Sequence, residues 1–262
     1  MKKICITGAG GGIGRAYANI LISEGYFLIL VDKDSESLKK LSSSFAPDVA
    51  QNIEYISVDL SENDQINFLV EKLTNEKELL GLINCAGLPS KPFDINSTTN
   101  YDELVLKVNL DVPIRLTKAA LNSISGNQDG FIINVCSFAG LVNGFSGAVY
   151  AASKSGLIRF TLAIASEHVG KGITFQALCP GKVHTDFEVV SDKGSIIPKP
   201  LLLSTEKVVI SSLRCLKIHK IICIPGVAYK FLYLYSKFHN AKFMVKVYYL
   251  MMKIGLFAKF KL

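Results

Sequence analysis

Five glycines near the start of the chain separate a short apolar run from an amphipathic pattern, and this arrangement restricts the possible folds more than any other stretch. The run at 2–7 predicts a strand, and the pattern that continues to Glu24 predicts a helix. A strand that turns through glycines into a helix directs backbone N–H groups and the positive helix end at an anion. We therefore predict a phosphate-binding turn; the alternative is a merely flexible glycine-rich loop. The motif is T-G-x-x-x-G-x-G, formed by Thr7, Gly8, Gly12 and Gly14.

Apolar runs and helical patterns alternate along most of the chain. The runs are apolar at nearly every position, which is typical of strands in a parallel sheet covered on both faces. The alternation predicts right-handed βαβ units and a single-domain α/β fold, a Rossmann-like doubly wound parallel sheet at 1–226 with an apolar, basic helical extension at 227–262. The later predicted strands are 26–31, 53–58, 79–84, 131–135, 174–178 and 221–224, and the later helices are 35–45, 62–73, 98–123, 150–170 and 205–216.

An acidic residue, Asp32, ends the second predicted strand, 18 residues after Gly14. A carboxylate at this place accepts hydrogen bonds from an adenosine ribose diol and repels a 2′-phosphate, which favours NAD over NADP. Lys33 and Arg15 weaken this preference, because either cation could reach a phosphate. We expect NAD as the cofactor and keep NADP as the alternative.

Small or polar residues follow later strands, at the edge where open α/β sheets bind their ligands. Ser137 comes after the fifth predicted strand, and Pro180-Gly181 redirect the chain after the sixth. The following stretch, 186–200, has no periodic pattern and is predicted to form a mobile substrate loop.

The helix predicted at 98–123 contains Asn109 and, close behind it, Pro113. Proline inside a helix removes one backbone hydrogen bond, so a kink is expected. That kink should lie near Asn109.

Tyr150 and Lys154 stand four residues apart at the start of the helix predicted at 150–170. Residues at this spacing share one helix face, so the phenol and the ammonium can reach the same site. A nearby cation favours phenolate and lowers the phenol pKa from about 10, which prepares the group for proton exchange with a substrate oxygen. The spacing by itself is weak evidence for a shared site, and the alternative is that one of the two residues is buried and the other solvated.

Together these residues resemble the short-chain dehydrogenase/reductase family over 1–186. The resemblance implies NAD(P)-dependent hydride transfer between nicotinamide and a carbinol or carbonyl carbon, which interconverts an alcohol and a ketone or aldehyde. One position departs from the pattern, because Cys85 stands where the family commonly has a second asparagine. The matching positions are Gly8, Gly12, Gly14, Asp32, Asp59, Asn84, Ala86, Gly87, Asn109, Ser137, Tyr150, Lys154, Pro180 and Gly181.

The resemblance also implies the roles of four catalytic residues. Tyr150 would be the acid/base, Ser137 would hold the substrate oxygen, and Asn109 would order a water in the proton relay. Lys154 would hold the nicotinamide ribose while lowering the pKa of Tyr150. Relatives are commonly dimers or tetramers, which implies a homo-oligomer.

A larger set is implied to bind or support the cofactor. Asp59 would meet the adenine, Asn84 would help to hold its strand beside the cofactor, and Val183 and Thr185 would meet the carboxamide. No metal is expected. The full cofactor set is Gly8, Gly12, Ile13, Gly14, Asp32, Asp59, Leu60, Asn84, Ala86, Gly87, Tyr150, Lys154, Pro180, Gly181, Val183 and Thr185.

The net charge of +7 is concentrated at the C-terminal end. Residues 1–186 hold 16 Lys and Arg against 19 Asp and Glu, whereas 187–262 hold 13 against 3. The basic segment is apolar and almost without Arg, whose planar fork usually reads bases. Nucleic acid is therefore not the expected partner, and an anionic lipid surface fits better.

Six cysteines are present, none in CxxC spacing, and they indicate small core residues in a reducing compartment. The apolar run behind the basic start, Ile4-Cys5-Ile6, is too short for the apolar region of a signal peptide. We expect a cytoplasmic protein, in contact with the inner face of the membrane if the tail binds lipid.

The tail at 227–262 contains ten of the 25 aromatic residues. Its two predicted helices are apolar nearly all round, except for Lys230 and Lys237 on the first and a second lysine line on the next. No uncharged run approaches the about 18 residues of a spanning helix. The helices could lie in a membrane interface, which we favour, pack against another subunit, or cover their own domain.

An apolar tail near the ligand edge suggests an apolar or lipid-like alcohol or carbonyl compound as substrate. A hypothesis of another class is a catalytically idle cofactor-binding scaffold that associates with membrane through its tail. The intact set of Asn109, Ser137, Tyr150 and Lys154 argues against this scaffold.

Overall fold

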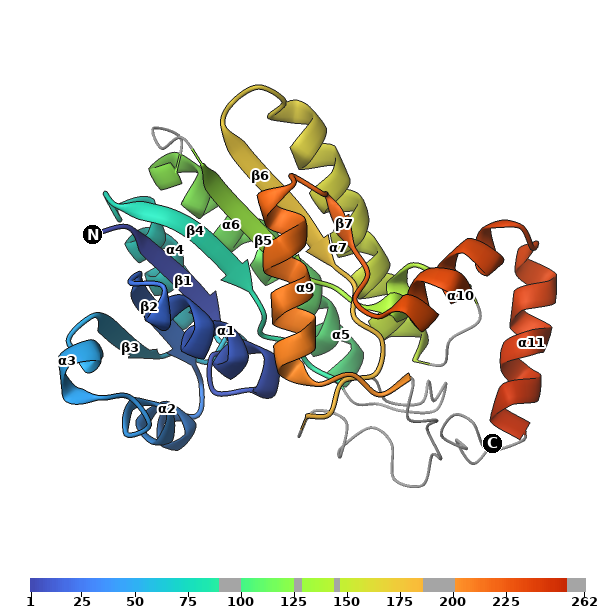
Figure 1. Cartoon of the computed structure of the whole chain (residues 1–262), viewed down its shortest axis with the longest axis horizontal. Helices are drawn as coiled ribbons and strands as arrows, with labels where there is room; N and C mark the ends of the chain where they lie inside the picture. The colour runs from blue at the N-terminus through green and yellow to red at the C-terminus, as the bar shows by residue number, and fades with distance from the viewer. Residues whose placement is uncertain (90–99, 125–128, 144–146, 186–200, 254–262) are drawn as a thin grey trace.

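The computed structural model contains one seven-stranded sheet, flanked by helices (Figure 1). The structure describes residues 1–89, 100–124, 129–143, 147–185 and 201–253, so the predicted substrate loop at 186–200 lies outside them. The strand order is β3-β2-β1-β4-β5-β6-β7, and every pairing is parallel. This confirms the predicted Rossmann-like α/β fold. The strands are β1 (Lys3–Thr7), β2 (Phe27–Asp32), β3 (Ile53–Ser57), β4 (Leu79–Asn84), β5 (Gly130–Val135), β6 (Ile173–Leu178) and β7 (Ile222–Cys223).

The sheet is buried on both faces. Along β1, Ile4 and Ile6 belong to one apolar cluster while Cys5, pointing the other way, belongs to a second. Helices α1, α2 and α9 contribute to the first cluster, and α4 and α6 to the second. Burial on both sides explains why the strands are apolar at successive positions. These helices are α1 (Gly12–Ser23), α2 (Ser35–Ser42), α4 (Asn63–Thr74), α6 (Val112–Ile124) and α9 (Thr205–Lys217).

The long helix expected around Asn109 is divided. Its described part consists of α5 (Tyr101–Leu106), a π-helical turn η1 (Lys107–Asp111) and α6. Pro113 is the second residue of α6 and directly follows this irregular turn, so the backbone bond that proline removes lies next to it. The irregularity lies where the sequence predicted a kink.

The remaining helices include two that the sequence did not predict. The helix predicted to begin at Tyr150 begins two residues earlier, as α7 (Ala148–Glu167). Two short helices, α3 (Pro47–Ala50) and the 3₁₀ turn η2 (Phe138–Gly140), were not predicted. The tail forms α10 (Val227–Lys237) and α11 (Ala241–Lys253). No helix in the described part of the chain is both long and apolar enough to span a bilayer.

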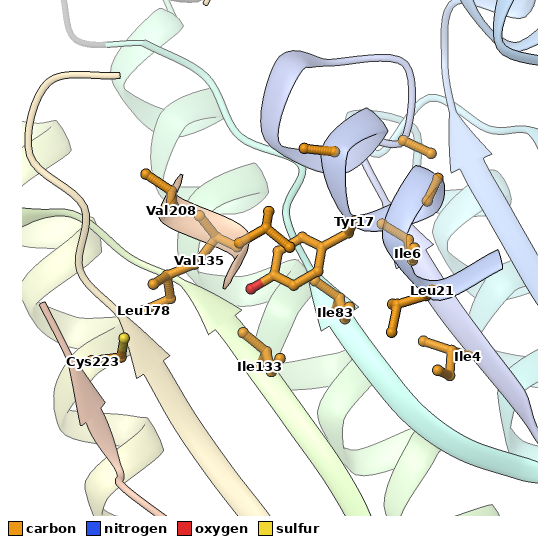
Figure 2. Close-up of a cluster of buried hydrophobic side chains, with 14 of the residues drawn as sticks. Ile4, Ile6, Tyr17, Leu21, Ile83, Ile133, Val135, Leu178, Val208 and Cys223 are labelled. Atoms are coloured by element: carbon orange, nitrogen blue, oxygen red, sulfur yellow. The ribbon is translucent and has the colours of Figure 1, made fainter. Parts of the chain in front are cut away.

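A buried hydrogen-bond chain joins α1, α9 and β6 inside the first apolar cluster. Tyr17 lies among apolar side chains from several strands (Figure 2), and its hydroxyl donates to Ser212 Oγ at 2.5 Å. Ser212 Oγ donates to Gln176 Oε1 at 2.5 Å, and Gln176 Nε2 returns a bond to the Ser212 carbonyl. Burial raises the pKa of Tyr17 well above its ordinary value, so its hydroxyl remains a donor.

Replacing the central serine tests this chain of bonds. Ser212→Ala leaves the Tyr17 hydroxyl and the Gln176 amide oxygen without this partner in a buried site, and should lower the free energy of unfolding by about 1–3 kcal/mol. The hydroxyl of the adjacent Ser211 donates to the Lys207 carbonyl on its own helix, so Ser211→Ala is the matched control. Urea denaturation of both variants gives the comparison, and equal midpoints would contradict the structural role.

Candidate active site

A cavity of about 410 Å³ opens at the carboxyl edge of the sheet. Its walls come from the ends of six strands, including β1 and β4, between which the strand order reverses. Such a reversal leaves a crevice, because the connections leave β1 and β4 toward opposite faces. The sequence-predicted residues that line the cavity are Gly8, Gly12, Ile13, Gly14, Asp32, Asp59, Leu60, Ala86, Gly87, Ser137, Tyr150, Lys154, Pro180, Gly181, Val183 and Thr185.

The glycine turn brings backbone against backbone. Gly8 has φ of +67°, and a Cβ there would lie 2.8 Å from the Ala86 backbone. A Cβ on Gly14 would lie 2.1 Å from the Gly8 carbonyl oxygen. The N-cap residue of α1, Gly11, supplies no side-chain hydrogen bond, so the turn leaves a bare helix N-terminus at the cavity. These residues fit a cofactor pyrophosphate, which binds to such N–H groups.

The Asp32 carboxylate is hydrogen-bonded to the backbone of the glycine turn and of the chain after β2. Its Oδ2 accepts from Gly10 N at 2.9 Å, and its Oδ1 accepts from Asp34 N at 3.0 Å. Of the two cations considered for a 2′-phosphate, Lys33 lines the cavity, whereas Arg15 does not and donates to the Gly10 carbonyl at 2.7 Å. The carboxylate thus lies at the cavity beside one lysine.

Two predicted asparagines support the cavity from behind and do not line it. Asn84 is buried, and its Nδ2 donates to Asn134 Oδ1 at 2.8 Å, which links β4 to β5. Asn109 is buried, accepts from Leu88 N at 2.7 Å and donates to the Leu88 carbonyl at 3.0 Å. Asn109 therefore fixes the chain just after Gly87.

The end of β5 and the start of α7 bring Ser137, Tyr150 and Lys154 to one wall. These segments can approach closely because Gly140 has no side chain. A Cβ on Gly140 would lie only 2.8 Å from the backbone of Lys154. Lys154 Nζ donates to the Val135 carbonyl at 2.9 Å and lies 5.9 Å from the centre of the Tyr150 ring. The predicted pair therefore shares one helix face.

Lys154 is almost completely buried, with 4% of its surface exposed. Burial lowers the pKa of its ammonium from the usual range, and nearby cysteines oppose this effect only partly. A positive charge in this low-dielectric wall acts more strongly on a neighbouring phenol than the same charge in water would.

Tyr229, in α10, is a cavity residue that the sequence did not reveal. Its hydroxyl accepts from Lys182 N at 2.8 Å and donates to the Leu201 carbonyl at 2.8 Å. Its ring fills the space beside Gly181, where a Cβ would lie 1.9 Å from a ring carbon. No sequence spacing could show this contact, because 48 residues separate Gly181 from Tyr229.

Other lining residues were also missed. Leu104 and Val108 are four residues apart on α5 and η1, so their shared face was readable as an apolar helix stripe. Tyr248 reaches the cavity from α11, in the tail. Ser61, Leu88 and Phe138 are further lining residues that were not predicted.

Removal of one oxygen tests the role of Tyr229. Tyr229→Phe should lower the free energy of unfolding by about 1–3 kcal/mol, because the partly buried Lys182 N–H and Leu201 carbonyl lose a partner. It should also weaken cofactor binding, since the Pro180–Lys182 loop lines the cavity. Tyr233→Phe, one turn along the same helix, is the control. Thermal unfolding and NADH fluorescence titration measure the two effects, and indistinguishable variants would contradict this role.

Comparison with known proteins identifies the family. A family model described as short chain dehydrogenase matches residues 2–194. The chain is 32% identical over 189 residues to the short-chain dehydrogenase/reductase aba4 of Botryotinia fuckeliana (strain B05.10), covering 70% of this chain and 72% of the relative. It is 28% identical over 198 residues to carbonyl reductase family member 4 of Xenopus tropicalis, covering 75% and 82%.

A solved structure extends the likeness to the whole fold. The short-chain dehydrogenase from Sphingobium yanoikuyae in complex with NADPH superposes with a TM-score of 0.78, at 21% identity, covering 97% of this chain and 95% of that one. The family match at 2–194 covers strands β1 to β6 and every lining residue of the cavity except Tyr229 and Tyr248. The chain therefore belongs to the short-chain dehydrogenase/reductase family and is an NAD(P)-dependent oxidoreductase.

Proposed function

We propose that this enzyme interconverts an apolar alcohol and its ketone or aldehyde, with Tyr150 as the acid/base. The observation that supports this most strongly is the convergence of Ser137, Tyr150 and Lys154 on one cavity with the glycine turn. When bound, the nicotinamide would supply or accept the hydride. The protein would supply the proton, the orientation of the substrate and the electrostatic field.

Each catalytic group would act through its own chemistry. The Tyr150 hydroxyl would give its proton to a carbonyl oxygen in reduction, and the Tyr150 phenolate would take the proton of the alcohol in oxidation. Lys154 would stabilise the phenolate, and its ammonium has three hydrogens, of which Val135 accepts one. Ser137 would donate to the substrate oxygen, and Asn109 would hold the wall through Leu88 or order a water in the proton relay.

The substrate side of the cavity supports an apolar ligand. Leu88, Leu104 and Val108 form part of the wall, and the ring of Tyr248 lies among the lining residues. Apolar walls with a few convergent polar groups are typical of sites for small apolar molecules. The carbonyl end of such a molecule would meet Tyr150 and Ser137.

NAD is the cofactor we infer, on the basis of Asp32. A carboxylate at the edge of the cavity would accept bonds from a ribose diol and would repel a 2′-phosphate, while Lys33 opposes that repulsion. The solved relative with NADPH shows that the fold also binds the phosphorylated cofactor.

Two further inferences concern the oligomeric state of the enzyme and its location in the cell. We infer a homo-oligomer in the cytoplasm, with peripheral contact to an anionic membrane through the tail. Lysines and apolar side chains on α10 and α11 support the membrane contact. The idle scaffold is not retained, because the chain carries the full set of acid/base residues of an oxidoreductase family.

Loss of the phenol oxygen tests the acid/base role. Tyr150→Phe should reduce kcat by about 10²–10⁴-fold, because proton transfer loses its donor, while NADH affinity stays within a few-fold of wild type. Steady-state turnover on a panel of apolar ketones and NADH fluorescence titration measure the two quantities. Tyr233→Phe is again the control. Wild-type turnover by Tyr150→Phe would overturn the mechanism.

A second substitution tests the cofactor preference. Asp32→Ala should reduce the ratio of kcat/KM for NAD to that for NADP by about tenfold or more, because the ribose acceptor and the repulsion disappear together. Asp34→Asn removes a nearby negative charge that does not line the cavity and keeps the cap of α2, so it is the control. An unchanged ratio in Asp32→Ala would show that Asp32 does not select the cofactor.

A further inference from the structure

Helix α10 has two different faces. Its inward face carries Tyr229, which is buried and holds the cavity loop. Its outward face carries an apolar stripe of Val227, Phe231 and Leu234, and its C-cap residue Phe238 continues this stripe at helical spacing. The exposed fractions of the four residues are 68%, 68%, 51% and 84%. Nothing in the described part of the protein covers this stripe.

Helix α11 repeats the arrangement. Its inward face places Tyr248, 8% exposed, in the cavity wall. Its outward face exposes Val245, Tyr249 and Leu250 at 51%, 57% and 58%. Figure 1 shows α10 beside β7 and α11 farther out, at one end of the molecule. We call the outward residues of the two helices the tail surface.

The tail surface is basic as well as apolar. Residues 227–253 contain five lysines, Lys230, Lys237, Lys242, Lys246 and Lys253, and no Asp or Glu. All the ion pairs found among the described residues lie outside α10 and α11. Lys242, Lys246 and Lys253 share the outward face of α11 with the apolar residues, at spacings of four and seven.

The combination selects one kind of partner. A second copy of the chain, docked symmetrically through the same surface, would place lysines against lysines without any carboxylate from these helices. An anionic bilayer offers acyl chains to the phenylalanines and leucines and negative head groups to the lysines. A lysine side chain is long enough to lie with its methylene groups in the apolar layer and its ammonium at the head groups.

We propose that the tail surface docks onto an anionic lipid bilayer. The same helices contribute Tyr229 and Tyr248 to the cavity, so docking would hold the active site next to the membrane. This deepens the membrane contact included in the proposed function by naming the face and its residues. It predicts binding whether or not the enzyme turns over a given substrate.

Point variants of the full chain are the suitable probes, because deletion of the tail would remove the buried Tyr229 ring. The measurement is co-sedimentation with phosphatidylcholine vesicles containing about 30% phosphatidylserine. Phe231→Ser/Phe238→Ser and Lys242→Glu/Lys246→Glu should each lower the vesicle partition coefficient by about tenfold or more. Wild type should bind pure phosphatidylcholine vesicles at least about tenfold more weakly.

Matched controls carry the same changes elsewhere. Val169→Ser/Ile218→Ser removes two apolar residues that are 81% and 71% exposed outside the tail, and Lys171→Glu/Lys217→Glu reverses two exposed lysines. Both controls should sediment like wild type, and all variants should keep their NADH affinity, which separates this test from a failure of the oxidoreductase site.

Three results would overturn the proposal. One is equal binding of tail and control variants, and another is equal binding of wild type to neutral and anionic vesicles. The third is an absence of vesicle binding together with a change of oligomeric state in Phe231→Ser/Phe238→Ser without lipid, which would make this face a subunit interface.

Discussion

The close approach of the glycine turn to the end of β4 is the contact on which the rest of the site depends. Thr7 Oγ1 accepts from Cys85 N at 3.1 Å and from Ala86 N at 3.2 Å, while Gly8 packs on the Ala86 backbone. These bonds fix two adjacent strands at the point where their connections diverge. The crevice that receives the cofactor is the consequence. A side chain at Gly8 would force the two strand ends apart, and one at Gly14 would force α1 away from the glycine turn.

The residues around the cavity divide into those that face it and those that hold it. Asn84 bonds to the buried Asn134 and Asn109 to the partly buried Leu88, so these two amides keep β4, β5 and the loop after Gly87 in place. Tyr229 does the same for the loop after β6. Buried polar groups suit this work because each unsatisfied partner would be costly, and the local geometry is therefore well defined.

The tail is joined to the enzyme through side chains on the inward faces of its helices. Tyr229 is buried in the main core, so α10 packs on the body although it lies beyond the last strand. The outward faces have the opposite character, with large aromatic and aliphatic residues in water. One pair of helices thus forms part of the cavity wall and presents an apolar, basic surface at the end of the molecule.

The sequence alone determined the α/β fold, since the near-continuous apolar runs, the glycine turn and the period of the helices are local patterns that parallel sheets require. It also pointed to Tyr150, Lys154, Ser137 and Asp32, because the spacing of a motif and the ends of predicted strands can be identified from the sequence. Only the tertiary structure decided that Asn84 and Asn109 lie behind the wall and that Tyr229 and Tyr248 enter it. Those contacts join residues distant in the chain, and their existence depends on how whole elements pack and not on any local period.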